Sequence, residues 1–195
     1  MKAVLVSIRP KWCEKIISGE KTIEVRKTRP KLNPPFRCYI YCTKAMERLI
    51  CILRDGDENY GEIYHGKTVF IKTDEGSICD TWGKRQKVFG EFTCDRIDEY
   101  DDDTIFSFQH EDYARWNDFD LDRACMHPED FQNYANGKWL YGWHISDLRV
   151  YDHPRDLWEF TGLRETKFGW APGPITRPPQ SWRYVEEEIW NDWSD

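Results

Sequence analysis

The chain has 195 residues, enough for one large domain or for one domain with a sizeable insertion. Aromatic residues make up 15% of the chain and include ten Trp. Intrinsically disordered chains are poor in aromatic residues, so we expect this chain to fold. The net charge of −7 argues against a protein that binds long duplex nucleic acids.

The charge is distributed unevenly along the chain. Residues 1–54 contain 13 Lys and Arg against 4 Asp and Glu, a net charge of +9, whereas the remaining residues have a net charge of −16. This asymmetry indicates a basic binding face in the N-terminal part. The alternative is that the basic and acidic parts fold against each other and neutralise.

No run of apolar residues is long enough to cross a bilayer, and the N-terminus lacks the pattern of a signal peptide. We therefore expect a cytoplasmic protein without membrane contact, whose seven cysteines are reduced. Cys125 and His127 are close in sequence and could form half of a metal site, but buried structural thiols are the favoured interpretation. We expect neither a metal nor a cofactor.

The first 27 residues predict a strand, a short helix, a glycine turn and a second strand. Residues 3–8 are aliphatic and suit a buried strand. Pro10 is typical of the first turn of a helix, and Gly19 suits the left-handed position that ends one. Residues 22–26 contain β-branched side chains and predict the return strand.

The rest of the chain continues this pattern of short strands. Turns are frequent and helices few, which predicts a barrel or a sandwich. We expect a mainly β (α+β) fold, an incomplete mixed β-barrel with a short N-terminal helix. Strands are expected at 36–43, 67–72, 87–96 with a bulge at Gly90, 139–151 and 181–185, with one or two helical turns at 154–160.

An acidic segment interrupts the strands. Residues 98–130 contain 12 Asp and Glu against two Arg, and their pattern predicts short helices or loops with aromatic anchors. We interpret the region around 98–135 as an insertion that caps one end of the barrel, followed from about residue 165 to 195 by an extended, proline-rich tail. Residues 1–195 are thus expected to form one domain.

Charged and apolar residues alternate directly after the glycine turn. Strand geometry places Glu24 and Arg26 on one face and Ile23 and Val25 on the other, facing the core. Lys21 could reach either a cleft or solvent. Glu24 and Arg26 can form an ion pair or hold a polar ligand together. The same alternation also suits a solvent-exposed strand with ordinary surface charges.

Residues 16–26, Ile-Ile-Ser-Gly-Glu-Lys-Thr-Ile-Glu-Val-Arg, follow Pro10-Lys11-Trp12 and resemble the signature of the ASCH family, which is related to PUA-like RNA-binding barrels. Segments 142–148 and 179–182 are further similar to phage- and prophage-associated ASCH proteins of bacteria. The resemblance implies a β-barrel whose cleft suits a nucleotide or a strand of RNA.

Two branches of the family imply catalytic alternatives. One hydrolyses the acetyl amide of acetylated cytidine with a motif Lys, a Thr three residues later and a Glu elsewhere. Lys21 matches the Lys, but Glu24 stands at the Thr position, so the nucleophile of that mechanism is missing. Another branch resembles a ribonuclease, whose catalytic residues do not map onto this sequence.

The leading interpretation is a module that binds RNA, single-stranded nucleic acid or a nucleotide. A hydrolase with Lys21 and Glu24 as acid and base is the alternative, and a protein-interaction domain that uses the acidic insertion is a third. The spacing of Trp12 with Ile16 favours a core role over base stacking, and His144 is expected to be a satisfied barrel residue. The candidate ligand contacts are Ser7, Arg9, Trp12, Arg26, Lys44, Ser181 and Trp182.

Overall fold

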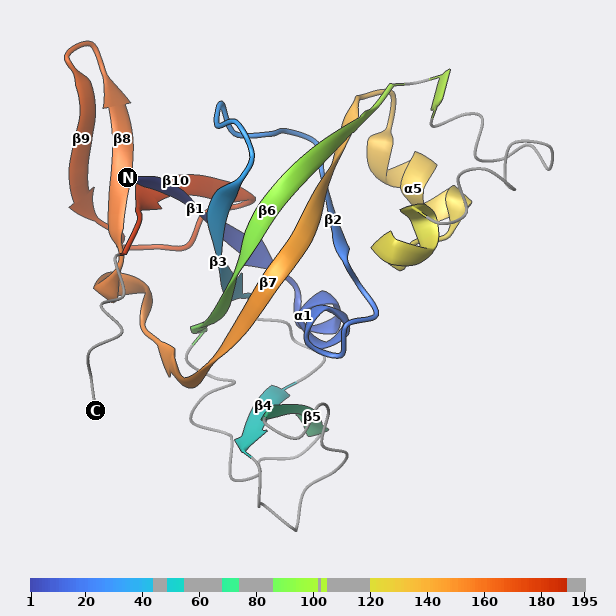
Figure 1. Cartoon of the computed structure of the whole chain (residues 1–195), viewed down its shortest axis with the longest axis horizontal. Coiled ribbons are helices and arrows are strands. Elements are labelled where there is room, and N and C mark those ends of the chain that lie inside the picture. The colour runs from blue at the N-terminus through green and yellow to red at the C-terminus, as the bar shows by residue number, and fades with distance from the viewer. Residues whose placement is uncertain (44–48, 55–67, 74–85, 102, 105–119, 189–195) are drawn as a thin grey trace.

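A computed structural model describes residues 1–43, 49–54, 68–73, 86–101, 103–104 and 120–188 (Figure 1). Its main sheet has eight strands, in the order β2-β7-β6-β3-β1-β10-β8-β9, and β4 and β5 pair separately. The elements are β1 (Lys2–Ile8), α1 (Pro10–Ile17), β2 (Ile23–Arg26), β3 (Phe36–Cys42), β4 (Leu49–Arg54), β5 (Thr68–Thr73), β6 (Val88–Tyr100), α5 (Pro128–Ala135), β7 (Leu140–Arg155), the 3-10 helix η1 (Leu157–Glu159), β8 (Thr161–Thr166), β9 (Gly169–Pro174) and β10 (Trp182–Glu186).

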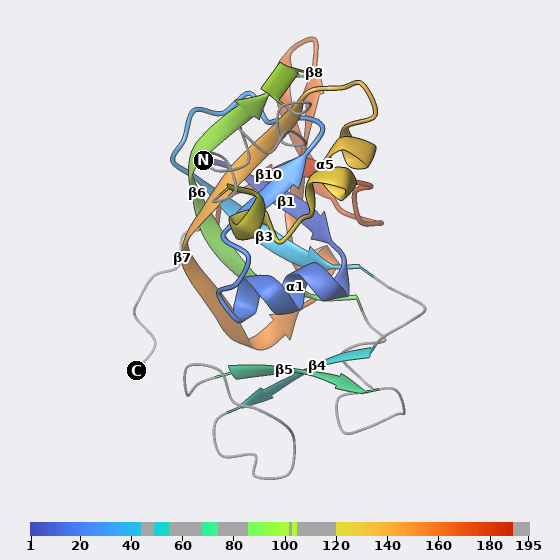
Figure 2. The same cartoon turned by 90° about the vertical axis from the view of Figure 1, so that its right-hand side faces the viewer.

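The main sheet is mixed and open. Strands β1 and β3 are parallel, the other neighbours are antiparallel, and β2 and β9 form its two ends. Figure 2 shows the long strands β6 and β7 bending along their length, so that the sheet curls without closing. This confirms the predicted mainly β, incomplete barrel.

Most predicted elements are confirmed in type and position. Helix α1 begins at Pro10, and Gly19 after it has the expected positive φ of 79°. The pairing of β6 with β7 shifts register between Val88 and Gly90, which confirms the predicted bulge. A Cβ at Gly90 would lie 2.6 Å from the carbonyl oxygen of Arg149, so this close approach requires glycine. Strands β4, β8 and β9 were not predicted, and β8 and β9 pair with each other where an extended tail from about residue 165 was expected.

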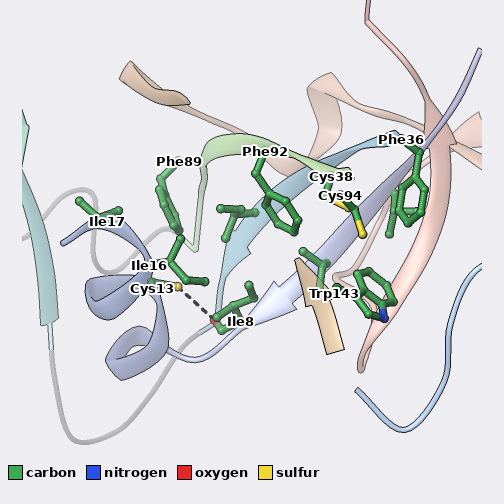
Figure 3. Packing of buried hydrophobic residues seen from close by; sticks show 13 residues of the cluster. Ile8, Cys13, Ile16, Ile17, Phe36, Cys38, Phe89, Phe92, Cys94 and Trp143 are labelled. Carbon is green, nitrogen blue, oxygen red and sulfur yellow. Dashed lines mark hydrogen bonds between the residues drawn. The ribbon is translucent and has the colours of Figure 1, made fainter. Parts of the chain in front are cut away.

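The main core fills the inside of the curled sheet, between α1 and strands β1, β3, β6 and β7 (Figure 3). Trp143 is its largest fully buried side chain, and Phe36 packs edge-on against it with ring centroids 6.2 Å apart. Cys13, Cys38 and Cys94 are free thiols buried in this cluster, as the sequence predicted.

The last part of the acidic insertion covers the other side of β2. Residues 120–124 are helical and α5 follows, and their apolar side chains form a separate core cluster. Ile23 and Val25 pack there against Leu121, Phe131 and Leu140. The expectation that Ile23 and Val25 face a core is therefore confirmed. Residues 102 and 105–119 lie outside the described part, and with them most of the predicted protein-interaction surface.

Within the ranges given above, the longest helices have eight residues, and none is long and apolar enough to cross a membrane.

Candidate functional site

A cavity of about 360 Å³ lies where the signature strand meets helix α1 and the insertion. It brings together residues that are far apart in sequence, because β1, β2, α5 and the tail before β10 all contribute. The lining residues are Ser7, Arg9, Lys11, Trp12, Lys21, Glu24, Val25, Arg26, Thr43, Met126, Tyr134 and Gln180.

Pairing with β7 aims the charged face of β2 inward. Glu24 lies opposite the fully buried Trp143, and Arg26 lies opposite Tyr141, so their side chains point to the concave side of the sheet. Glu24 is only 5% exposed, Arg26 8% and Lys21 2%. The interpretation of β2 as a solvent-exposed strand with alternating charges is wrong, because both faces of β2 are buried.

One carboxylate holds two buried cations. The Arg26 Nη2 atom is 2.8 Å from Glu24 Oε1, and the Lys21 Nζ atom is 3.5 Å from Glu24 Oε2. Arg26 also donates to the carbonyl oxygen of Ser7 at 2.7 Å, and Lys21 donates to that of Ala124 at 2.6 Å. These bonds tie Arg26 to strand β1 and Lys21 to the insertion.

Two features distinguish this cluster from a simple ion pair. The buried Arg26 Nε–H has no hydrogen-bond partner among the described residues. Burial away from water lowers the pKa of Lys21, and the neighbouring Glu24 carboxylate only partly opposes that shift. The cluster therefore has an unused N–H group and an amine that loses its proton more readily than an exposed lysine.

The lowered pKa predicts a pH-dependent stability. The folded state releases the Lys21 proton at a lower pH than the unfolded chain does, so the unfolded chain binds more protons between these two pKa values. The free energy of unfolding should rise with pH in that window, which ends near 10.5, the ordinary pKa of a lysine. Urea titrations at several pH values above 7 should show this rise in the wild type and not in Lys21→Met. A constant difference between the two proteins would contradict it.

Two aromatic rings flank the cluster. The Lys21 Nζ atom is 5.0 Å from the Trp12 ring centroid, a cation–π contact, and Trp12 also packs against the main core while lining the cavity. The core and ligand-facing roles considered for Trp12 are thus compatible. Tyr134 from α5 is 36% exposed, and the Lys27 Nζ atom lies 5.0 Å from its ring centroid.

The fold of the whole chain is similar to the crystal structure of ASCH from Zymomonas mobilis, with a TM-score of 0.53 over 95% of this chain and 88% of that chain. This chain has the ASCH fold. Sequence identity to that protein is 16%, and a mutant form of it gives 15% identity and a TM-score of 0.53 over 95% and 89% of the two chains. The sequence matches no protein-family profile and no curated protein.

In this ASCH fold, the cavity collects many of the residues singled out from the sequence. Its lining includes Ser7, Arg9, Trp12 and Arg26, together with Lys21 and Glu24. The Ser7 hydroxyl donates to the carbonyl oxygen of Pro179 at 2.7 Å, which ties the tail to the cavity rim.

Other predicted site residues lie elsewhere. Ser181 and Trp182 do not line the cavity, whereas their neighbour Gln180 does. The Trp182 Nε1–H donates to Thr28 Oγ1 at 2.9 Å, and its ring packs 6.1 Å from that of Trp143. Lys44 lies outside the described residues. Val25, Thr43, Met126 and Tyr134 line the cavity although the sequence pattern did not single them out as ligand contacts.

Among the described side chains, His127, His144 and the partly exposed thiols of Cys42 and Cys125 lie outside that cavity. His144 is 5% exposed, with its Nε2 atom 2.5 Å from Asp98 Oδ2 and its Nδ1 atom 3.2 Å from Arg123 Nη2, which confirms a satisfied barrel residue. Cys125 and His127 line an adjacent hollow of about 580 Å³. Across the described ranges, no group of three or more His, Cys, Asp or Glu side chains is arranged to hold a metal.

Proposed function

We propose that this protein binds a nucleotide or a short single-stranded RNA, with one nucleotide in the cavity at β2. The observation that carries the proposal is the buried arrangement of Lys21, Glu24 and Arg26 beside an aromatic ring, with the Arg26 Nε–H group left without a partner among the described residues. The signature resemblance described above and the ASCH fold support the same ligand class.

Each part of a nucleotide has a matching group in the cavity lining. Trp12 offers a ring face for stacking on a base, and the Arg26 guanidinium offers N–H donors to a phosphate or a base edge. Four lining side chains are cationic and one is acidic, which favours an anionic ligand. A volume of 360 Å³ is near the lower end of the 300–1,000 Å³ range typical of ligand sites and suits one nucleotide unit.

Arg26→Ala is the direct test of this proposal. We expect the affinity for short single-stranded RNA or a nucleoside monophosphate to fall about tenfold or more, because a charge-assisted hydrogen bond contributes about 1.5–3 kcal/mol. Wild-type binding should also weaken as the salt concentration rises. Fluorescence titration of the tryptophans measures both effects.

Arg29→Ala is the matched control, because it removes the same charge from an exposed residue outside the cavity. Arg26→Lys keeps the charge but loses the planar fork, so a variant that stays folded is available if the alanine variant unfolds. Unchanged affinity in folded variants of Arg26, or no binding of either ligand class by the wild type, would refute the proposal.

A hydrolase acting on a modified nucleoside or on RNA is the second candidate. The 3.5 Å separation of the Lys21 amine from the Glu24 carboxylate, together with the lowered pKa of Lys21, favours it, since a neutral amine can accept a proton during hydrolysis. Product formation that is lost in Lys21→Ala and in Glu24→Gln, while ligand binding persists, would establish this activity. A pure binding module gives no turnover.

We also propose that residues 1–195 form a single domain, because the insertion contributes both to a core cluster and to the cavity wall.

A further inference from the structure

A second concave site lies near the end of the main sheet opposite β2, where β8, β9 and β10 meet. It has a volume of about 290 Å³ and is lined by two arginines, Arg164 and Arg183, while every other lining residue is Gly, Ala or Pro. In Figure 1, β8 and β9 lie at the opposite side of the molecule from α1, β2 and α5. The site is therefore separate from the cavity at β2.

The strand register brings the two arginines together. Val185 of β10 pairs with Gly162 of the antiparallel strand β8. Continuing this register by two residues in each strand places Arg183 directly opposite Arg164, with both side chains on the same face. Directly opposed like charges destabilise a sheet unless something neutralises them.

No carboxylate of the described residues pairs with either arginine. The Arg183 Nε–H group is buried and has no hydrogen-bond partner within the same ranges. An unsatisfied buried donor costs about 1–3 kcal/mol, so the site has both an unpaired donor and an unneutralised charge pair.

The absence of a side chain at Gly162 leaves room for the Arg183 guanidinium. A Cβ at residue 162 would lie 2.9 Å from the Arg183 Cζ atom, so the guanidinium rests against the backbone of β8 and is held at the site. Gly173, which pairs with Gly162 from β9, likewise leaves the opposite wall without a side chain. Two guanidinium-bearing side chains that line one hollow, and a wall without acidic side chains, match a tetrahedral oxyanion.

We propose that Arg164 and Arg183 form a phosphate-binding site. One phosphate accepts hydrogen bonds from both guanidinium groups, including the Arg183 Nε–H, and relieves the repulsion between them. The lining has no aromatic ring on which a base could stack, so the site takes the phosphate group alone, either as inorganic phosphate or as part of a nucleic-acid backbone.

Titration of the full chain with inorganic phosphate at constant ionic strength tests the site, with the melting temperature and isothermal calorimetry as readouts. We expect a saturable rise in Tm for the wild type, and at least a tenfold loss of phosphate affinity in Arg183→Gln. Gly162→Ala should have a similar effect without any change in charge, because the new methyl group displaces the guanidinium. Arg177→Gln, which removes an exposed arginine outside the site, should bind like the wild type.

Phosphate-free buffer gives an independent readout that does not depend on affinity. There, Arg164→Gln should raise Tm by about 1–3 °C, because it removes the like-charge contact. The proposal is overturned if the wild type shows no saturable response, if Arg183→Gln responds like the wild type, or if Arg164→Gln lowers Tm in phosphate-free buffer.

Two further ligands identify the source of the phosphate. If a dinucleotide whose only phosphate is the internal diester displaces bound inorganic phosphate, the site is assigned to a nucleic-acid backbone. If that dinucleotide does not displace it, the site is assigned to the free ion. Either result supports the site. Lys21→Met and Arg26→Ala should retain phosphate binding here, so failure of the nucleotide proposal at β2 and failure of this one are distinguishable.

Discussion

Replacing Glu24 with alanine is expected to lower the free energy of unfolding by about 3–5 kcal/mol, because it leaves two buried cations without their shared carboxylate. Lys21 and Arg26 are both at least nine-tenths buried and lie within 3.5 Å of Glu24. Neither has another described carboxylate as an ion-pair partner. Urea denaturation at neutral pH measures the loss.

Two variants separate charge from shape at this position. Glu24→Gln keeps the volume and a hydrogen-bond acceptor, and its cost should be smaller than that of the alanine variant. Adding Lys21→Met to Glu24→Gln removes one buried cation as well, so the double variant should recover part of the lost stability. Equal stability of the wild type and Glu24→Ala would show that the cluster is solvated rather than buried.

Trp143→Ala is expected, on its own, to lower the free energy of unfolding by about 3–5 kcal/mol, because it opens a cavity in the main core. The Trp143 side chain is fully buried and lies between the rings of Phe36 and Trp182. A thermal or chemical denaturation curve reports the loss directly.

Trp143→Phe serves as the comparison for that prediction. The indole N–H of Trp143 is buried and has no hydrogen-bond partner among the described residues, so phenylalanine removes an unsatisfied donor while it loses some packing. We expect its cost to be less than half that of the alanine variant. A phenylalanine variant as unstable as the alanine variant would mean that the N–H group is satisfied in solution.

The fold of the first 27 residues was predictable because local signals agree there. Pro10 and Gly19 mark the two ends of α1, and the β-branched residues after Gly19 give β2. Strand β4, by contrast, was missed because a short apolar run beside a charged stretch has no clear periodicity.

The site was only partly predictable, for a physical reason. Alternation along β2 correctly separates Glu24 and Arg26 from Ile23 and Val25, but alternation cannot show that both faces are covered. The second cover comes from residues about 100 positions later, and nothing local in the sequence places Tyr134 or Met126 beside the signature. Arg183 and Arg164 were missed for the same reason, since only the register of β8 and β10 brings them together.

The bond from the Lys21 amine to the Ala124 carbonyl has a thermodynamic consequence. A ligand that draws this amine toward itself competes with one of the bonds that fasten residues 120–135 to the barrel, whereas a ligand that also contacts Met126 or Tyr134 strengthens the docking of that segment. Occupancy and the docking of that segment are therefore linked in both directions by one coupling free energy. Sequence changes confined to the segment can retune affinity while the barrel strands stay the same.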